Sequence, residues 1–434
     1  MSEFIEKKLE RYAKFGSVLG LERMEKLMDS FGNPQESLKC IHIAGTNGKG
    51  SVSAYIYEVL RAAGYSVGMF TSPYVRDFNE RIQVDGKSIT DDDCAELIDS
   101  ISRNVDDILA SGCDSPTEFE VLTAMAFLYF ERKNVDFAVL EVGLGGIGDS
   151  TNIIKNPLIT LISSISYDHM DRLGNSISEI AREKAGILKP GIPSVCNIKI
   201  PEAAKTVARR AYEIGVPLYD AARIKPAHFQ MNADVTSFDL NLFGLNYGKI
   251  ELSMTGEHQI SNAVTALTAL EVLRKNGHIK LNIEQVHSGM LFAKLPCRFE
   301  RLSSNPEIIV DGAHNQEGVG ALVKNVRTLY GGKKILCVLG ILADKEYEKV
   351  CNILSALACD FVAAEVDNER KLSRHVLSET LNECNQNVVF TGHLEECYAY
   401  AMNEMQSANY DLLIFTGSLY FASAVRRIFT DGKE

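Results

Sequence analysis

The chain has 434 residues, of which 46% are hydrophobic and 24% are charged, so it is long enough for two or three domains with sizeable cores. Its formal net charge of −12 disfavours a general role in binding polyanions such as nucleic acids, because neutralising phosphates requires concentrated Lys and Arg. The ten cysteines form no Cys-x-x-Cys pair, the N-terminus lacks the apolar core of a signal peptide, and no apolar run is long enough to cross a bilayer; we therefore expect a cytoplasmic protein without membrane contact.

The first half of the chain alternates short apolar runs with segments of helical length, which is typical of a parallel sheet covered by helices. We expect strands at residues 40–44, 66–70, 136–141, 158–163 and 193–197. We expect helices at residues 50–63, 117–132, 176–188 and 201–214. Alternating apolar and polar residues between 226 and 255 then predict a small antiparallel element, and a long helix follows from about Gln259 to Lys275.

The strand–helix alternation begins again after residue 300. Further strands are expected at residues 308–310, 335–339, 361–365, 388–390 and 412–415. We place a domain boundary near Leu295, which gives a large domain at residues 1–295 and a smaller α/β domain at residues 296–434.

The most specific local signal is a glycine-rich loop between the 40–44 strand and an amphipathic helix. The loop residues are Gly45, Thr46, Asn47, Gly48, Lys49, Gly50 and Ser51. The glycines allow backbone N–H groups to converge on one point, and Lys49 and the helix N-terminus add positive charge, so the loop suits a triphosphate. It departs from the common GxxxxGK[ST] pattern because Gly50 precedes Ser51, and the alternative is a strand-to-helix turn with one exposed lysine.

The residues after the other strands narrow the class of nucleotide enzyme. The chain lacks an Asn-Lys-x-Asp or Thr-Lys-x-Asp segment that would recognise guanine, which disfavours a GTPase switch.

Three expected strands are followed by Ser72, by Glu141 and by the pair Asp168–His169, and the ends of parallel strands meet at one sheet edge. Their hydroxyl, carboxylate and imidazole groups could hold one Mg²⁺ beside the phosphates, although a lone His at a strand end is more often structural.

Lys184 lies late in the helix expected at 176–188. Its position in the sequence alone predicts a solvated lysine on the protein surface.

Twelve segments together resemble the folylpolyglutamate synthase and dihydrofolate synthase family of the Mur-ligase-like superfamily, and they occur in family order across nearly the whole chain. They lie at residues 44–51, 71–74, 80–82, 117–127, 141–146, 149–152, 166–174, 180–193, 256–267, 296–300, 311–315 and 416–420. The resemblance implies an α/β fold with a P-loop-type, mostly parallel sheet flanked by helices, followed by a smaller Rossmann-like α/β domain. It also implies a monomer.

The resemblance implies an ATP-driven ligation. A substrate carboxylate attacks the γ-phosphate to give an acyl phosphate, and the amino group of L-glutamate then attacks that mixed anhydride. The implied substrates are dihydropteroate or a reduced folate, and the implied cofactors are ATP and two Mg²⁺ ions. Such chemistry relies on positioning and charge neutralisation rather than on a covalent nucleophile.

Roles for individual residues follow from the same resemblance. Gly48, Lys49, Gly50 and Ser51 would hold the phosphates, and Ser72, Glu141 and His169 would bind the first Mg²⁺. Lys184 matches a lysine that family members carbamylate, so it would become a ligand of the second Mg²⁺. Nucleotide contacts are implied for Asn262, Arg298 and Asp311, and orientation of the incoming amino acid for Asp311, His314 and Ser418. We therefore take Lys49, Lys184, Asp311 and His314 as the candidate catalytic residues.

The remaining implied contacts are to the folate-type substrate. Thr117, Phe119 and Asp149 match positions near the substrate pocket, but Thr117 with Glu120 is also a helix capping box, and Phe119 could simply be part of the core.

Three positions depart from the family pattern. Ile147 and Gly148 replace an Arg and a Leu on a loop that lines the substrate in relatives, and Cys297 replaces a Gly before Arg298. Losing the Arg removes a natural partner for an anionic substrate group. Two alternatives therefore stay open: a divergent ligase that acts on a carboxylate other than a folate, and a non-catalytic nucleotide-binding protein.

Overall fold

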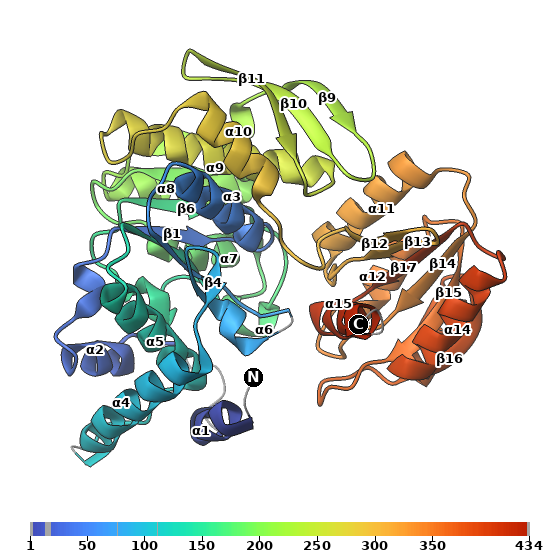
Figure 1. Cartoon of the computed structure of the whole chain (residues 1–434), viewed down its shortest axis with the longest axis horizontal. Helices are drawn as coiled ribbons and strands as arrows, with labels where there is room; N and C mark the ends of the chain where they lie inside the picture. Colours follow the sequence, from blue (N-terminus) through green and yellow to red (C-terminus); the bar gives the residue numbers. More distant parts are fainter. Residues whose placement is uncertain (1–2, 14–18, 76, 111, 432–434) are drawn as a thin grey trace. The chain divides into compact units, whose positions relative to one another are not determined.

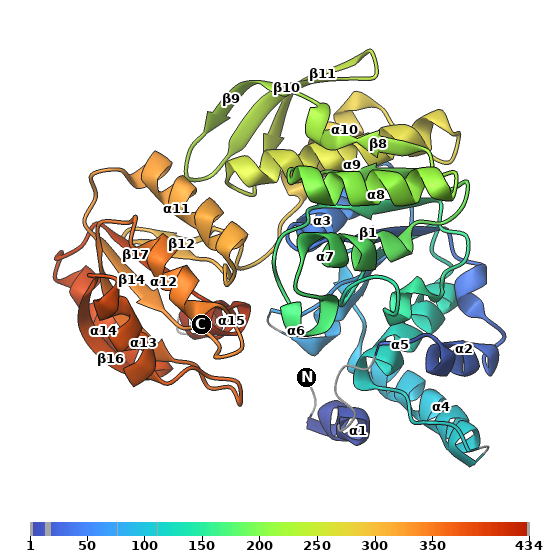
Figure 2. The same cartoon turned by 180° about the vertical axis from the view of Figure 1, so that it is seen from behind.

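The computed structural model describes residues 3–13, 19–75, 77–110 and 112–431. The chain divides into two compact units. The first comprises Met1–Ala227, Asp239–Ile250 and Ser261–Ala293, and the second comprises His228–Phe238, Glu251–Ile260 and Lys294–Glu434. Figures 1 and 2 label the helices and strands of both units.

The first unit is built around an eight-stranded sheet with the strand order β4-β3-β2-β5-β1-β6-β7-β8. Its strands are β1 (Cys40–Ala44), β2 (Val67–Phe70), β3 (Ile82–Val84), β4 (Lys87–Ser88), β5 (Phe137–Glu141), β6 (Ile159–Ile162), β7 (Ser194–Cys196) and β8 (Leu218–Asp220). The strands from β2 to β8 in this order run parallel, and β3 and β4 continue the sheet as an antiparallel edge. The central strands β1, β2, β5 and β6 are buried at every position, as parallel strands covered on both faces must be.

Helices cover both faces of this sheet (Figures 1 and 2). The helices up to residue 292 are α1 (Glu3–Ala13), α2 (Glu22–Asp29), α3 (Lys49–Ala62), α4 (Asp91–Ala110), α5 (Glu118–Arg132), α6 (Met170–Leu173), α7 (Ile177–Lys184), α8 (Pro201–Glu213), α9 (Glu257–Lys275) and α10 (Ile283–Phe292). Short 3₁₀ helices are η1 (Pro34–Glu36), η2 (Phe78–Arg81), η3 (Ser150–Ile153), η4 (Ala185–Ile187) and η5 (Ala221–Arg223). No helix in the described ranges has the length and apolar character needed to cross a membrane.

Cys40 and Ala44 lie on one face of β1 but belong to two different hydrophobic cores. The side chain of Cys40 belongs to a cluster with residues of α1, α2, α4 and α5, whereas Ala44 belongs to a cluster with residues of α7 and α8. Ile41 and Ile43 point to the opposite face. There α3 packs on β1, β2 and β5 and is itself covered by α10, where a Cβ on Gly289 would lie 2.4 Å from Cα of Val59.

A small antiparallel sheet has the order β11-β10-β9. Its strands are β9 (Ala227–Met231), β10 (Thr236–Leu242) and β11 (Leu245–Leu252). This is the antiparallel element that the alternation between 226 and 255 predicts.

The second unit contains a six-stranded sheet with the order β12-β13-β17-β14-β15-β16. Its strands are β12 (Glu300–Ser304), β13 (Glu307–Val310), β14 (Ile335–Leu339), β15 (Cys359–Glu365), β16 (Asn387–His393) and β17 (Leu412–Thr416). Only the β12–β13 pair among them is antiparallel. Its helices are α11 (Gln316–Tyr330), α12 (Tyr347–Leu354), α13 (Arg374–Glu383), α14 (Leu394–Gln406) and α15 (Leu419–Asp431). The predicted fold class, with two mostly parallel α/β parts, is confirmed.

A buried ion pair fixes α2 against α5 in the first unit. The guanidinium of Arg23 donates two hydrogen bonds to the carboxylate of Glu120, at 3.1 Å and 2.9 Å. Glu120 is 3% exposed and also closes the capping box with Thr117 at the start of α5. The Glu120 carboxylate depends on Arg23, because at this depth water cannot replace the guanidinium as its partner.

We expect Arg23→Ala to lower the free energy of unfolding by about 3 kcal/mol, because it leaves the buried Glu120 carboxylate without its cation. The matched control is Lys155→Ala, which removes an exposed pair with Glu36 (side chains 70% and 48% exposed) and should change stability by less than about 1 kcal/mol. Urea denaturation followed by circular dichroism measures both. Equal, small losses would contradict the assignment of Arg23 as a structural cation.

Candidate active site

The glycine-rich loop lies between β1 and α3, and its shape excludes side chains at two positions. A Cβ on Gly45 would lie 2.0 Å from Oγ of Ser163. Gly48 has φ +83° as the N-cap of α3, and a Cβ there would lie 2.4 Å from Oδ1 of Asn262 in α9. The structure thus brings Asn262 directly onto the loop, as its predicted role at the nucleotide requires, and both glycines are needed for close approach rather than for flexibility alone.

Serines that follow β6 brace this loop, and the sequence analysis did not identify them. Asn47 N donates to Oγ of Ser164 (3.0 Å), and Oγ of Ser163 donates to the Asn47 carbonyl oxygen (2.7 Å). Thr46 Oγ1 accepts from the backbone N–H of Ser166 (3.1 Å). The signal in the sequence was the run Ser163-Ser164-Ile165-Ser166 directly after an apolar strand, because small hydroxyl residues there can satisfy backbone groups of the neighbouring loop.

Two ammonium groups converge on one carbonyl oxygen of the loop. Lys49 Nζ donates to the Gly45 carbonyl oxygen at 3.1 Å, and Lys184 Nζ donates to the same atom at 2.9 Å. The carboxylate of Glu141 lies 4.0 Å from Lys49 Nζ. Phosphate oxygens placed at this point would meet concentrated positive charge together with the N-terminus of α3.

The expectation that Lys184 taken alone is a solvated surface lysine is wrong. Its side chain is 5% exposed at the end of α7, where it lies against the loop rather than in water. Burial, and to a smaller extent the nearby Lys49 ammonium, together lower its pKa from 10.5 to about 7, while Asp168, Asp149 and Glu183 oppose the shift. Helical periodicity over one short helix does not reveal this, because the covering element comes from residues far away in the sequence.

The predicted first metal ligands stand at neighbouring strand ends of the first unit. β2 and β5 are adjacent, with Phe70 paired to Leu140, so Ser72 and Glu141 follow at the same sheet edge. Glu141 is buried (4% exposed), whereas the side chain of His169 is 43% exposed at the N-cap of α6. Within the described ranges no three His, Cys, Asp or Glu side chains form a metal-binding group. One carboxylate with a hydroxyl still fits Mg²⁺, which usually takes one or two protein carboxylates and completes its shell with phosphate and water.

The loop after Glu141 is packed between Phe119 and the end of α7, two places where site residues are predicted. A Cβ on Gly143 would lie 2.4 Å from the Phe119 ring, and a Cβ on Gly146 would lie 2.5 Å from the Glu183 carbonyl oxygen. Phe119 is therefore both partly buried against the core and in contact with this loop. Thr117 is confirmed as the N-cap of α5 with the capping box predicted from Glu120.

The two departures on this loop have different surroundings. Gly148 lies against the backbone of the N-terminal segment: its carbonyl oxygen accepts from Gly20 N (3.0 Å), and a Cβ would lie 2.9 Å from that nitrogen. A leucine does not fit there, so Gly148 is explained by local packing. Ile147 is 46% exposed, and its backbone N–H donates to the Glu183 carbonyl oxygen (3.1 Å).

In the second unit, the predicted residues gather at the ends of the adjacent parallel strands β13 and β17. Both carboxylate oxygens of Asp311 accept backbone N–H groups, from Phe299 and Ala313 at 2.7 Å each. Burial raises the pKa of Asp311, and the neighbouring Arg298 opposes this shift. The ring of His314 donates from Nδ1 to the Gly312 carbonyl oxygen (2.9 Å), which fixes its orientation.

Ser418 and Cys297 have local structural roles in the same unit. Ser418 is 2% exposed, and its Oγ accepts from the backbone N–H of Phe421 at the start of α15. Cys297 has φ +57°, in the region that favours glycine, and its carbonyl oxygen accepts from Gly312 N (2.8 Å). The cysteine thus adopts a backbone conformation that L-residues rarely adopt, next to Arg298.

Comparison with known proteins decides the family. The Mur ligase middle domain matches residues 43–270, and the Mur ligase glutamate ligase domain matches residues 297–419. The dihydrofolate synthase/folylpolyglutamate synthase of Bacillus subtilis is 38% identical over 420 residues, covering 95% of this chain and 96% of that protein. The chain belongs to the folylpolyglutamate synthase and dihydrofolate synthase family of Mur ligases. The predicted class of ATP-dependent ligase is thereby confirmed.

Solved folylpolyglutamate synthases have the same fold. The Mycobacterium tuberculosis enzyme, crystallised with ADP and AMPPCP, superposes with a TM-score of 0.88 and 30% sequence identity, covering 98% of this chain and 97% of that chain. An FPGS–AMPPCP–folate complex has a TM-score of 0.82 and 31% identity, covering 98% of this chain and 99% of that chain. Nucleotide and folate complexes are thus known for this family.

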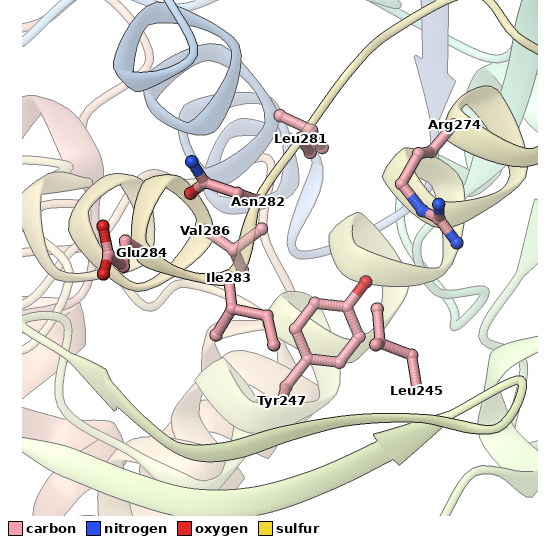
Figure 3. Close-up of a pocket in the computed structure, with 8 residues that line it drawn as sticks. All are labelled: Leu245, Tyr247, Arg274, Leu281, Asn282, Ile283, Glu284 and Val286. Carbon is pink, nitrogen blue, oxygen red and sulfur yellow. The ribbon is translucent and has the colours of Figure 1, made fainter.

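A separate cavity of about 520 Å³ lies at β11, α9 and α10 of this ligase (Figure 3). It is lined by Leu245, Tyr247, Arg274, Leu281, Asn282, Ile283, Glu284 and Val286. The Arg274 guanidinium at its edge is bound to buried Glu271, which also accepts from the Tyr247 hydroxyl (3.0 Å). These lining residues include no residue of the phosphate loop and none of Ser72, Glu141 and His169, so we assign the chemistry to the loop and not to this cavity.

We expect Gly45→Ala to weaken binding of an ATP analogue to this ligase by at least about tenfold, because the added methyl displaces Ser163 and with it the loop. Gly320→Ala in α11 is the control, since its added methyl meets nothing within 4 Å and alanine favours a helix. Isothermal titration calorimetry with AMPPCP measures both. Unchanged affinity in Gly45→Ala would remove the loop from the nucleotide site.

The buried Lys184 also predicts a pH dependence. Its pKa is about 7 in the folded protein against 10.5 for a free lysine, so between these pH values the unfolded chain binds a proton that the folded chain does not. This contribution therefore makes the protein more stable as the pH rises from about 7 to 10.5. We expect Lys184→Met to lose that increase and the exposed-site control Lys205→Met to keep it, in urea midpoints at pH 7.5 and 9.5. The same pH slope in all three proteins would mean that Lys184 stays protonated.

Proposed function

We propose that this ligase joins L-glutamate to dihydropteroate, to a reduced folate, or to both. The observation that carries the proposal is the convergence of Lys49 and Lys184 on the Gly45 carbonyl oxygen beside Glu141, on a loop braced for phosphates. The names of the relatives, dihydrofolate synthase and folylpolyglutamate synthase, support the choice of substrate. The folate complex of a protein with this fold supports it as well.

In this proposal the phosphate loop holds the triphosphate of ATP. Backbone N–H groups from Gly48 to Ser51 face the phosphates, and Lys49 neutralises charge on the γ-phosphate as the substrate carboxylate attacks it. Asn262, whose side chain lies against Gly48, contacts the nucleotide in this proposal. The products of this step are ADP and an acyl phosphate. The amine of glutamate then displaces the phosphate and forms the amide.

We propose two Mg²⁺ positions. Ser72, Glu141 and His169 would hold the first ion, which supplies charge neutralisation at the phosphates when bound. Lys184 would contribute to the second. Its lowered pKa leaves a substantial fraction of neutral amine near pH 7, and a neutral amine reacts with CO₂ to give a carbamate and a proton. The carbamate carboxylate would be the oxygen ligand that a hard cation prefers.

Residues of the second unit would serve the nucleotide and the amino acid. Arg298 and Asp311 are proposed nucleotide contacts, and their charges lie close enough to influence each other. His314 and Ser418 are proposed to orient glutamate. We place the functional boundary near residue 295, with residues 1–295 binding ATP and residues 296–434 completing the ligase.

A second candidate substrate is a carboxylate other than a folate. Ile147 favours it, because this exposed position offers an apolar side chain where relatives have a cation. In either case Asp149 would act through the shape of the loop, because its buried carboxylate accepts from Leu144 N and from Thr151.

We further propose that the protein acts as a monomer in the cytoplasm. All ten cysteines are free, and seven of them are buried, which suits a reducing compartment.

The test is to incubate the purified protein with MgATP, L-glutamate and either dihydropteroate or tetrahydrofolate, and to follow phosphate release and product mass. We expect a glutamate adduct with at least one pterin. Lys184→Ala should abolish turnover while ATP affinity stays largely unchanged. Phosphate release with another carboxylate, but no adduct with either pterin, would favour the second candidate substrate.

A further inference from the structure

The centre of β1 carries a polar residue that the proposed chemistry does not use. His42 is fully buried, between β5 and β6, in the otherwise apolar strand Cys40–Ala44. Burial lowers its pKa to about 3, so the ring is neutral at physiological pH and has one N–H donor and one acceptor nitrogen. A neutral ring at this place has no acid–base role, and its value must lie in the hydrogen bonds that it makes.

The ring starts a directed chain of hydrogen bonds. His42 Nε2 lies 2.8 Å from Oγ1 of Thr151, and the Thr151 hydroxyl donates to Oδ1 of Asp149. Because the hydroxyl proton is used toward the carboxylate, the Thr151 oxygen must accept from His42, which places the ring proton on Nε2. All three side chains are at most 3% exposed.

Asp149, the last residue in this series of hydrogen bonds, closes the loop that follows Glu141. Oδ2 of Asp149 accepts from Leu144 N (2.8 Å), while its Oδ1 also accepts from Thr151 N (3.1 Å). The carboxylate therefore joins both ends of residues 144–151. Within this segment Gly146 and Ile147 contact the backbone at Glu183, next to Lys184.

The protein retains this arrangement at a cost in stability. Among the described residues, Nδ1 of His42 has no hydrogen-bond partner, and neither has Oγ1 of Thr160 or Oγ of Ser194. These three residues are register neighbours on β1, β6 and β7, and all are fully buried. Unpartnered buried polar atoms destabilise a fold, so packing alone does not account for a histidine at this position.

We propose that His42 is a positioning residue of the ligase, which acts through Thr151 and Asp149 to hold residues 142–149 against Lys184 and thereby fixes Glu141 and Lys184 for turnover. This inference rests on the proposed function, since it concerns the same site. Positioning groups one shell removed from a metal or reacting group typically contribute about 10- to 100-fold to activity.

Paired variants separate the hydrogen bonds from packing. Thr151→Val removes the hydroxyl at nearly constant volume, whereas Thr151→Ser keeps it. His42→Leu removes the ring donor, and His42→Gln offers an amide N–H at the place of Nε2. We expect kcat to fall about 10- to 100-fold in the Val and Leu variants and to return to within about threefold of wild type in the Ser and Gln variants. Affinity for ATP without magnesium should stay unchanged, because the phosphate loop is braced by Ser163 and Ser164.

Thermal unfolding identifies the temperature at which every variant is folded, and kcat is compared there. Equal kcat loss in Thr151→Ser and Thr151→Val, or wild-type kcat in Thr151→Val, would overturn the proposal. If the variants of one residue do not fold, the variants of the other residue, His42 or Thr151, are judged by the same criteria.

Two measurements on the protein without substrates test the hydrogen bonds directly, so their outcome does not depend on the proposed ligase activity. Nitrogen-15 NMR of labelled histidine, assigned with His42→Gln, should show the Nε2–H tautomer without titration above about pH 5. Hydrogen exchange of peptides covering residues 142–151 should accelerate at least about tenfold in Thr151→Val and stay unchanged at residues 49–62. An Nδ1–H tautomer or unchanged exchange would refute the positioning chain even in an active ligase. If the wild type ligates no pterin yet gives the expected tautomer and exchange, the substrate assignment fails and the positioning chain stands.

Discussion

Close contact between the phosphate loop and its neighbours is the constraint on which the rest of the first unit depends. The loop has no room for a Cβ at Gly45 or Gly48, because Ser163 and Asn262 fill that space. This contact aligns the end of β1 with the end of β6 and with α9. With the loop in place, the Gly45 carbonyl oxygen becomes a common acceptor for two lysines from different helices. An anion site results without any large charged surface, in agreement with the acidic composition of the chain.

Lys184 shows how burial changes the protonation of an ordinary side chain. The same residue in water would carry its proton at every physiological pH. Placed against the loop beside a second ammonium, it holds the proton weakly, and the carboxylates around it do not fully compensate. Its neighbour Glu183 is buried to a lesser extent, and burial raises the pKa of that carboxyl group as well. At the end of α7, burial therefore disfavours the charged form of both side chains.

The sequence predicted the main strands well, because parallel strands buried on both faces are continuous apolar runs: β1 and β14 have the expected bounds. It did not predict the short edge strands β3, β4, β8 and β12, which have two to five residues and little apolar pattern. Motif order supplied the family. Three features could not be predicted: the burial of Lys184, the hydrogen bonds from the serines after β6 to the phosphate loop, and the hydrogen bond from His42 to Thr151. Each depends on contact between residues more than a hundred positions apart in the sequence.

The Asp149 carboxylate makes residues 144–151 into a closed ring whose shape does not depend on the side chain at its outer tip. Ile147 occupies that tip, where its backbone N–H donates to the Glu183 carbonyl oxygen and its side chain is half exposed. Evolution can therefore exchange this one side chain without redesigning the scaffold beneath it. Substrate preference and catalytic geometry become separable traits, and related ligases could diversify in what they recognise while the machinery that activates the carboxylate stays the same.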